Sequence, residues 1–516
     1  MKLWKLFSMP FKKTIAHGEK TDSNSVTQFV DLSLVKNESW ALLTFAGCQD
    51  VKIQKMIMNA EYNISSLLIY CEGIVDTKQI NETIIPSLHD WLKEVDSQPL
   101  TEDTILLGWS MSTLHKETIL DHIVTKVFDG ELILFFEGVK SAFIINIAKP
   151  PTRNPEESNS EISIRGPRDG FIEDISVNVA LVRKRLRTKS LSYEQFTLGK
   201  RSQTKAGLLY IKDIIQPKIV EEAKARLSSI DTDAVYSSNE LEELLSESKF
   251  SLIPLFDYTG RPDYVVSSLL RGRFAIILDG VPTAIIAPAN LMLLVKTAED
   301  IHNSYSNITF GRILRLFGLC ISLFLPGFYI AITTYHQDQI PLTLLATLVT
   351  SRKGVPFPTP IEAFVMLVLF ELFREAGMRL PSAVGQTLAV VGGLIIGEAA
   401  IRAGLTSPSL LVVIAATLVS TFTLVNQSLA GGVSIIRLGI LLISSFLGIF
   451  GFFLSIFVLL ISLANLKSFG IPFLAPISPI TWRDVTASLV RLPASFQNKR
   501  PKMLNVQDST RERSKK

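Results

Sequence analysis

Charged residues are distributed so unevenly along this 516-residue chain that their distribution constrains the fold more than any motif does. From Gly311 to Ile480, 170 residues carry 14 charged side chains, whereas the other 346 residues carry 86. A uniform soluble enzyme would not concentrate its charge in this way. The sequence therefore predicts an α/β soluble amino-terminal half followed by an all-α polytopic membrane domain.

The net charge changes sign along the chain. The whole chain carries +4, residues 481–516 carry +6, and residues 1–310 sum to −6. An acidic soluble half makes nucleic acid an unlikely partner class, because neutralisation of phosphates supplies most of the affinity in such complexes. A basic segment directly after a hydrophobic region follows the positive-inside rule. Residues 481–516 are therefore predicted to be a basic cytoplasmic tail.

Cysteine usage and the first residues both favour a reducing compartment. Cys48, Cys71 and Cys320 are the three cysteines, and none are spaced as C-x-x-C. No apolar core of signal-peptide length follows the first lysines of MKLWKLFSMPFKK. The expectation is that both termini are cytoplasmic, so the number of complete membrane crossings should be even.

The soluble half is predicted to contain two small α/β lobes. Its expected parts are a flexible basic arm at 1–25, a first lobe at 26–148, a proline-rich linker at 149–161 and a second lobe at 162–310. In the first lobe, Ser66–Cys71 is typical of a buried strand and Ile80–Val95 has helical spacing. The β-rich runs 132–136 and 142–147 predict a hairpin.

The second lobe begins with a predicted helix. Ile172, Ile175, Val179, Val182 and Leu186 are spaced to share one helix face. Further helices are expected at 216–227 and 239–245, and Asp279-Gly280 predicts a hairpin between 273–278 and 281–287. Pro282 should confine the second strand to an edge, or occupy its first position.

The membrane half, 311–480, contains four uncharged stretches of spanning length. Spans are expected at about 316–336, 380–400, 408–430 and 438–465, with Gly431-Gly432 as a helix stop. A fifth helix at 360–376 is short and charged at its end, which favours a re-entrant or tilted helix beside a pore. Glu362 follows Thr359 with capping-box spacing, so helix capping is its simplest role. Five or six spans stay open as alternatives.

Charged residues within the predicted membrane segments are the sharpest functional clue. Glu371, Arg374 and Glu375 share a helix face, Arg379 is an i+4 partner of Glu375, and Glu398 and Arg402 repeat that spacing. Charge at bilayer depth is costly, so these side chains should face protein or water. Two interpretations stay open: a pore or gating role, or ion pairs that hold helices together.

Small residues recur every four positions in the span at 380–400. Gly385, Ala389, Gly393 and Gly397 would line one ridge of a helix. Such a ridge lets helices approach closely in lipid. The sequence does not say whether that contact lies within one subunit or between subunits.

Enzyme and metal signatures are absent from the sequence, and no cofactor is expected. There is no G-x-S-x-G, P-loop or H-E-x-x-H motif. His115 and His122 are seven residues apart, and on one helix face they would lie too far apart to share a metal. The loop formed by Arg165, Gly166, Pro167, Arg168, Asp169 and Gly170 is either a binding loop or a turn with Asp169 near the cap of the next helix; turn chemistry favours the second interpretation.

Several long phrases resemble the A subunits of GerA-type spore germinant receptors. They are RGPRDGFIEDISVNVALVRKRLR, LPGFYIAITTYHQDQIP, PFPTPIEAFVMLVLFELFREAGMRLP and GEAAIRAGLTSPSLLVV, which occur between about residues 160 and 480. The resemblance implies a protein of the spore inner membrane that works with B and C subunits and with membrane lipid around it. It also implies a homo-oligomer that conducts monovalent cations when a nutrient is sensed.

Two other functions are weighed against that one. A secondary transporter would be favoured by internal repeats and broken helices, and no convincing repeat is visible in residues 311–480. A non-conducting scaffold of the receptor complex would use the same charges as structural ion pairs. The nutrient and the number of subunits are not encoded in any pattern that we identify.

Overall fold

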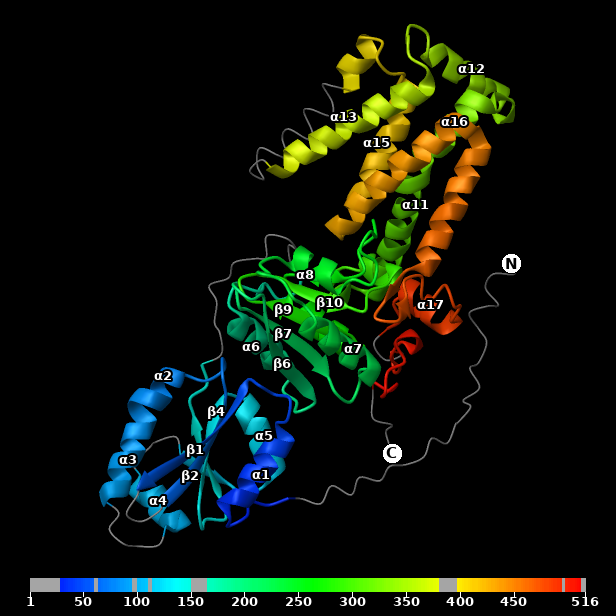
Figure 1. Ribbon diagram of the computed structural model, residues 1–516. Helices are drawn as coiled ribbons and strands as arrows, with labels where there is room; N and C mark the ends of the chain where they lie inside the picture. Colours follow the sequence, from blue (N-terminus) through cyan, green and yellow to red (C-terminus); the bar gives the residue numbers. More distant parts are fainter. Residues whose placement is uncertain are drawn as a thin grey trace, which may run out of the picture.

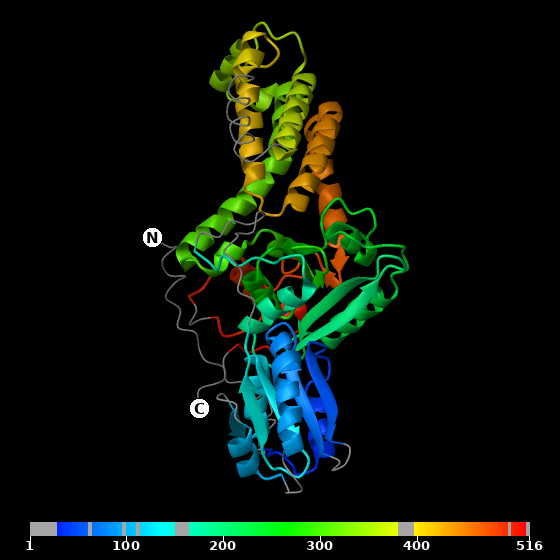
Figure 2. The same cartoon turned by 90° about the vertical axis from the view of Figure 1, so that its left-hand side faces the viewer.

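The computed structural model describes residues 28–59, 64–94, 100–109, 114–149, 165–379, 397–493 and 497–511. Two α/β lobes and a helical domain lie one after another along its long axis, with the second lobe in the middle (Figures 1 and 2). The predicted basic arm, and the predicted linker apart from Lys149, lie outside the described residues. The predicted fold class is confirmed.

The first lobe is a five-stranded antiparallel sheet in the order β1-β2-β4-β5-β3. Its strands are β1 (Val51–Asn59), β2 (Ile64–Cys71), β3 (Leu114–Glu117), β4 (Glu131–Phe136) and β5 (Ala142–Asn146). Its helices are α1 (Leu34–Thr44), α2 (Thr77–Gln79), α3 (Ile85–Glu94), α4 (Glu102–Gly108) and α5 (Leu120–Phe128), with a π-helical segment, η2 (Ile80–Ile84). The predicted hairpin of β4 and β5 is confirmed.

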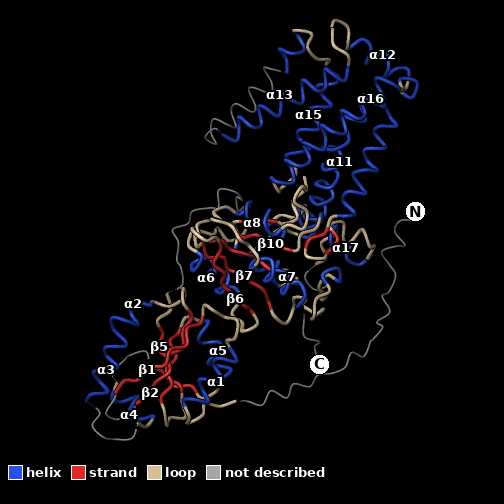
Figure 3. The backbone as a smooth tube through the Cα atoms, viewed as in Figure 1, coloured by secondary structure: helices blue, strands red, loops and turns tan. Residues whose placement is uncertain are grey.

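Helices cover both faces of this sheet (Figure 3). Successive strand residues point to opposite faces, so Ile133 and Phe135 pack with α1 and α5, while Leu134 and Phe136 pack with α3 and α4. His115 lies on β3 and His122 on α5, so the expectation that one helix carries both is wrong. The segment Leu114–Glu117 pairs with β5, and this tertiary pairing overrides its weak strand preference and any helical spacing.

The second lobe repeats the architecture of the first. Its sheet has the order β6-β7-β9-β10-β8, with β6 (Leu191–Leu198), β7 (Thr204–Ile211), β8 (Asp257–Thr259), β9 (Phe274–Leu278) and β10 (Ala284–Ala287). Its helices are α6 (Ile175–Arg185), α7 (Pro217–Ser228), α8 (Ser238–Leu245) and α9 (Pro262–Leu269). In chain order both lobes run helix, two strands, helices, strand, helix, two strands, and both sheets place their third strand at an edge.

Two details of the predicted second lobe are wrong. The hairpin of β9 and β10 forms, but β10 begins at Ala284 and lies between β9 and β8, so Pro282 is in the turn and not in an edge strand. Helix α6 begins at Ile175 after its cap, Asp174. Ile172 precedes the helix because its backbone N–H donates to the Asn178 side chain, 2.8 Å away.

A buried ion pair joins the two lobes. Arg183 on α6 is fully buried, and its Nε and Nη2 each donate to the Asp50 carboxylate at 2.9 Å. Asp50 directly precedes β1 in the first lobe. Backbone bonds between Gly47, Gln49 and Tyr193 extend the same contact. The lobes are therefore held together by specific buried groups.

The helical domain begins at α11 (Tyr305–Tyr335) and continues through α12 (Leu342–Ser351), α13 (Thr359–Arg379), α15 (Pro408–Phe422) and α16 (Gln427–Asn465). Short helices α10 (Leu291–Leu294), η3 (Ala298–Ile301) and η4 (Gln337–Gln339) flank α11. In the described part of the chain, α11 and α16 are the two helices with the length and apolarity needed to cross a bilayer.

Helix α16 is a hairpin of two helices rather than one rod. A straight helix of 39 residues would separate its ends by about 58 Å. Both ends of α16 lie at the second lobe, where Asn426 contacts Asp257 and Phe469 contacts Phe274. Figure 1 shows the chain reversing within α16. The non-helical residue in this element is Gly448, with φ 59° and ψ −139°. The predicted span at 438–465 is therefore divided between two arms.

The predicted span at 408–430 is also wrong. Helix α15 ends at Phe422, and α16 begins four residues before Gly431. The reason is a cap that sequence inspection overlooked: the Asn426 side chain accepts a hydrogen bond from the Leu429 N–H at 3.0 Å. Gly431 and Gly432 therefore lie within the first turns of α16 and stop nothing.

Helix α13 has 21 residues, three more at its carboxyl end than expected. It is about 31 Å long, which is the length of a complete crossing. Most of the predicted span at 380–400 lies outside the described residues, which resume at Gly397.

The carboxyl-terminal residues fold back onto the second lobe. They form a small hairpin of β11 (Lys467–Ser468) and β12 (Ile471–Pro472), then α17 (Trp482–Leu489) and η6 (Lys502–Leu504). The Ser468 hydroxyl donates to the Leu255 carbonyl at 2.8 Å, and the Phe469 ring packs on Phe274 with centroids 4.9 Å apart. The end of α16 is thus anchored in the core of the second lobe.

Candidate functional site

The predicted charges of α13 meet an arginine from another helix. Glu371 pairs with Arg374 at 2.8 Å and also with Arg437 of α16. Arg437 is fully buried, and its Nη1 donates to the Thr421 hydroxyl of α15 at 3.0 Å. Ser434 accepts hydrogen bonds from both arginines. This cluster, Glu371–Arg374–Ser434–Arg437, connects α13, α15 and α16.

The cluster holds Glu371 in ion pairs, which is one of the two interpretations that the sequence left open. Its side chain is 19% exposed and is directed at α16 between two guanidinium groups, because Arg437 supplies a buried cation that needs a carboxylate. Glu371 is therefore not the exposed carboxylate of α13. Glu375, one turn later, is exposed. The side chain of Arg379 lies outside the described residues.

Glu362 caps a neighbouring helix rather than its own. Its buried carboxylate accepts hydrogen bonds from the Thr406 hydroxyl at 3.1 Å and the Ser407 hydroxyl at 2.7 Å. It also accepts from the backbone N–H of Ser407, the cap residue of α15. The prediction that Glu362 caps its own helix is therefore wrong: its carboxylate serves the start of α15, because α13 and α15 pack side by side.

The remaining predicted membrane residues have simpler surroundings. Glu398 and Arg402 form an i, i+4 ion pair of 2.5 Å and are 58% and 79% exposed. Gly385, Ala389 and Gly393 lie outside the described residues. A Cβ on Gly397 would lie 3.3 Å from the Leu411 side chain, so this last member of the ridge faces α15.

The loop at 165–170 is a structural turn within the second lobe. A Cβ on Gly166 would lie 2.1 Å from the Arg261 guanidinium, which is 2% exposed and pairs with Asp263 and Glu299. Asp169 pairs with Arg185 at 2.6 Å in the last turn of α6, so it does not cap that helix. The other members of the turn are Arg165, Pro167, Arg168 and Gly170. These contacts hold the loop within the second lobe, and the binding-loop interpretation stays a prediction.

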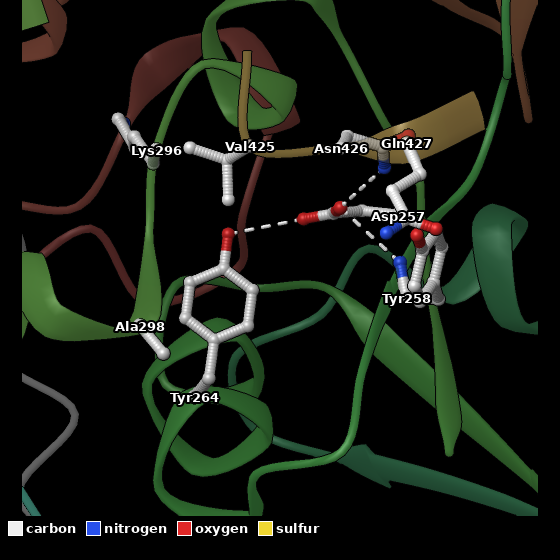
Figure 4. A pocket seen from close by; sticks show the side chains of 8 residues that line it. All are labelled: Asp257, Tyr258, Tyr264, Lys296, Ala298, Val425, Asn426 and Gln427. Carbon is white, nitrogen blue, oxygen red and sulfur yellow. Dashed lines mark hydrogen bonds between the residues drawn. The ribbon is translucent and has the colours of Figure 1, made fainter. Parts of the chain in front are cut away.

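A small polar cavity marks the junction of the second lobe with the helices. It has a volume of about 120 Å³ and lies between α9, β8 and the start of α16. Figure 4 shows Tyr264 and Asn426 converging on the Asp257 carboxylate; their hydrogen bonds measure 3.0 and 3.1 Å. Burial raises the pKa of Asp257 to about 6. Proton uptake at this carboxylate would change its hydrogen bond with Asn426, which connects the second lobe to α16.

Close backbone packing strengthens that junction. A Cβ on Gly432 of α16 would lie 2.0 Å from the Leu252 carbonyl oxygen of the second lobe. A Cβ on the adjacent Gly431 would meet nothing within 4 Å. Glycine at 432 therefore lets the lobe contact α16 at the distance seen.

Sequence inspection missed the residues that connect helices to one another and to the lobe. In the sequence, Arg437 is a single charge between two long apolar stretches. Such an isolated charge indicates that a partner lies elsewhere in the membrane domain, and this was the available signal. Asp257 and Asn426 are separated by 169 residues, and nothing local indicates that they meet. Within the described residues, no group of three or more His, Cys, Asp or Glu side chains is placed to hold a metal ion.

Comparisons with known proteins point in one direction. The model of the family described as Bacillus/Clostridium GerA spore germination protein matches residues 42–503. Spore germination protein XA of Bacillus anthracis is 49% identical over 482 residues, which are 93% of this chain and 97% of that protein. Spore germination protein KA of Bacillus subtilis is 33% identical, over 93% of this chain and 88% of its own length.

One further relative extends the pattern, and one solved structure is similar to about half of the chain. Spore germination protein GerLA of Bacillus cereus is 36% identical over 89% of this chain and 93% of its own length. The crystal structure of the N-terminal domain of the A subunit of the Bacillus megaterium spore germinant receptor GerK3 is 25% identical, with a TM-score of 0.41. It covers 51% of this chain and 98% of that domain.

Proposed function

Because this chain belongs to the GerA family of spore germination proteins, we propose that it is the A subunit of a nutrient germinant receptor and conducts monovalent cations as an oligomer. It has no enzymatic role in this proposal. It would act in the spore inner membrane with B and C subunits, which bring the nutrient signal to it.

The arrangement of the chain ends supports a common side for the lobes and the tail. Helix α11 leaves the second lobe, and the second arm of α16 returns to it. A chain that enters and leaves a helical domain on the same side crosses it an even number of times. Placing the lobes and residues 481–516 on the spore-core side also satisfies the positive-inside rule.

The observation that carries the proposal is a continuous connection from the lobe to the charged helix. Asp257 holds Asn426 at the start of α16, and Arg437, three turns later on α16, pairs with Glu371 of α13. A displacement of the second lobe would therefore move α16 and, through a buried ion pair, α13. This is how a signal at the lobes would reach a helix that faces a conduction path.

Within that path, Glu375 is the proposed cation-facing carboxylate. Oligomerisation would repeat the outer face of α13 around an axis, and a ring of carboxylates favours cations. Glu375 is exposed on that face, whereas Glu371 is directed into the subunit. Glu371, Arg374 and Arg437 then act as the brace that fixes the orientation of α13.

A comparison of neutral variants in spores tests the proposal. Glu375→Gln should leave receptor levels normal and slow the early release of potassium after nutrient addition. Glu371→Gln should instead lower receptor levels, because it leaves the buried Arg437 without a carboxylate. Glu398→Gln, which removes an exposed carboxylate from the Glu398–Arg402 pair, is the matched control and should release potassium normally.

The pairing of Glu371 favours a second candidate, a non-conducting scaffold. Two arginines around one carboxylate leave little negative charge inside the subunit to attract a cation. Normal potassium release from Glu375→Gln spores with normal receptor levels would support this scaffold over the channel.

A further inference from the structure

A large basic cavity lies where the second lobe meets α11 and the carboxyl-terminal residues. Its volume is about 520 Å³, and its walls come from the end of α9, the segment around Lys296, the first turns of α11, and α17. Nine of its lining residues are arginine or lysine, whereas two, Asp300 and Asp484, are acidic. The cavity is distinct from the small one at Asp257, although Tyr264 and Lys296 line both.

The two carboxylates of the cavity are already engaged. Asp300 pairs with Arg312 at 2.9 Å and with Arg315 at 3.0 Å. Asp484 accepts a hydrogen bond from the backbone N–H of Met503 at 2.9 Å. Asp300 is thus shared between two arginines, and neither carboxylate forms an ion pair with Arg271 or Lys296.

The cations of the cavity without a carboxylate partner include Arg271 and Lys296. Arg271 and Lys296 are half-buried, and among the described residues neither has a carboxylate within ion-pair distance. The buried Arg273 beside them donates to the Pro288 carbonyl and the Asn290 amide oxygen, which carry no charge. Half-buried cations without counter-charge are costly unless something else supplies it.

The electrostatics agree with this geometry. Burial and the neighbouring Arg273 lower the pKa of Arg271 to about 10. Burial, with Arg271 and Arg312 nearby, lowers the pKa of Lys296 well below its ordinary range. Cations that lower one another's pKa in this way mark a region of strongly positive potential. A bound anion would reduce that potential.

We propose that this cavity binds a phosphate-bearing anion, with Arg271 and Lys296 as its principal contacts. A phosphate ester carries up to two negative charges and several acceptor oxygens, which match a guanidinium fork and an ammonium. The volume exceeds what a single small ion needs and suits a phosphate attached to a larger group.

Two sources of that phosphate are compatible with the site. Arg312 in the cavity wall lies on α11, close in sequence to the exposed residues Phe310, Ile313 and Phe317. Trp482, at the start of α17, is 74% exposed. Aromatic and basic residues together are typical of the surface of a membrane with anionic lipids. A lipid headgroup and a soluble phosphate ester share the chemistry, so the experiment separates them.

The test uses the full-length chain in nanodiscs and measures its thermal unfolding. One arm compares phosphatidylcholine with mixtures that contain phosphatidylglycerol, and the other adds inorganic phosphate to phosphatidylcholine nanodiscs at constant ionic strength. The cavity variant is Arg271→Gln with Lys296→Met. Its matched control is Arg201→Gln with Lys200→Met, which removes two exposed cations that do not line the cavity.

The wild-type chain and the control should be stabilised in at least one arm, and the cavity variant should bind the same ligand about tenfold more weakly or worse. Stabilisation by phosphatidylglycerol alone assigns a lipid headgroup, whereas stabilisation by inorganic phosphate assigns a soluble ester. No stabilisation of the wild type, or equal stabilisation of the cavity variant, overturns the proposal. If the double variant does not fold, Lys296→Met alone gives the same comparison.

Discussion

At the scale of single residues, the contact between the lobes depends on the buried pair Asp50–Arg183. Arg183 is fully buried, Asp50 is 6% exposed, and the guanidinium also lies 4.5 Å from the Phe128 ring centre. Asp50→Asn would leave a buried cation without its counter-charge. We expect it to lower the stability of the full-length chain by about 3 kcal/mol, as measured by thermal unfolding in neutral detergent.

A second ion pair between the lobes provides the control. Arg187 and Asp129 lie 2.6 Å apart but are 56% and 27% exposed. Exposed pairs contribute at most about 1 kcal/mol, so Asp129→Asn should change the unfolding temperature little. Equal losses in the two variants would show that burial does not set the strength of the contact.

The junction carboxylate Asp257 should make stability depend on pH. Burial raises its pKa from 3.8 to about 6, so the folded state holds the proton more tightly than the unfolded state. This contribution is complete below about pH 4 and is lost as the pH rises through about 6, at a cost of about 3 kcal/mol. Glu242, whose pKa burial raises to about 8, extends the same trend to higher pH.

Asp257→Asn removes the ionisable group and keeps its shape. The fall in unfolding temperature between pH 4.5 and pH 7 should therefore be smaller than in the wild type. Asp231→Asn, at a carboxylate that is 70% exposed, is the control and should keep the wild-type profile. A wild-type profile in the Asp257 variant would remove this carboxylate as the cause.

The sequence indicated the partner of a charged residue only where the two residues were close along the chain. The spacing of Glu371 and Arg374 predicted their ion pair, which forms at 2.8 Å. The buried Arg437 lies 66 residues from Glu371, and without that partner the face of α13 that Glu371 occupies could not be identified. The direction of the Glu371 side chain therefore depends on a contact that no local pattern in the sequence indicates.

At the scale of elements, the reversal in α16 depends on Gly448. Its φ of 59° with ψ of −139° lies in a region that is essentially restricted to glycine, and a Cβ would lie 3.1 Å from the Tyr335 side chain. Gly448→Ala should destabilise the turn by about 1–3 kcal/mol and reduce the yield of folded chain. The measurement is the fraction of monodisperse protein after extraction into detergent.

Gly439→Ala, in the first arm of the same hairpin, is the matched control. A Cβ there meets nothing within 4 Å, and alanine is the better helix former, so the yield should be unchanged or higher. If both variants behave alike, the reversal does not require glycine at 448.

The elements that could be predicted were those with a strong local pattern. The hairpins at β4–β5 and β9–β10 and helices α7 and α8 follow from turn residues and apolar spacing. The reversal at Gly448 could not be predicted, because residues 438–466 are uniformly uncharged and glycine is common in membrane helices. Patterns of apolar residues show where a helix is stable, but they do not show where a long apolar run folds back.

At the scale of the whole molecule, the two lobes are one architecture used twice. Their sheets have equivalent strand orders, and their elements follow in the same sequence along the chain. The order of strands in space depends on contacts distant in sequence, so the sequence predicted two α/β lobes but not their equivalence. Among the described residues, the core of the second lobe is the one that continues into the helices.

The contact of the second lobe with α16 should decide whether the molecule transmits a signal. A Cβ on Gly432 would lie 2.0 Å from the Leu252 carbonyl oxygen, which is closer than two atoms can approach. Gly432→Ala must therefore push the lobe away from the helix. Because Asn426 holds Asp257 two turns earlier on the same element, that displacement would also strain the junction. We expect Gly432→Ala spores to contain the receptor yet to release little potassium on nutrient addition.

The adjacent glycine separates loss of coupling from loss of folding. Gly431→Ala makes the same chemical change one residue away, where a Cβ meets nothing within 4 Å, and its spores should germinate normally. Both alanines favour the helix equally, so a difference between the two variants can only come from the contact with Leu252. Normal potassium release in Gly432→Ala spores would mean that the second lobe reaches the helices by another route, of which the anchor of Phe469 in the lobe core is the strongest that the structure offers.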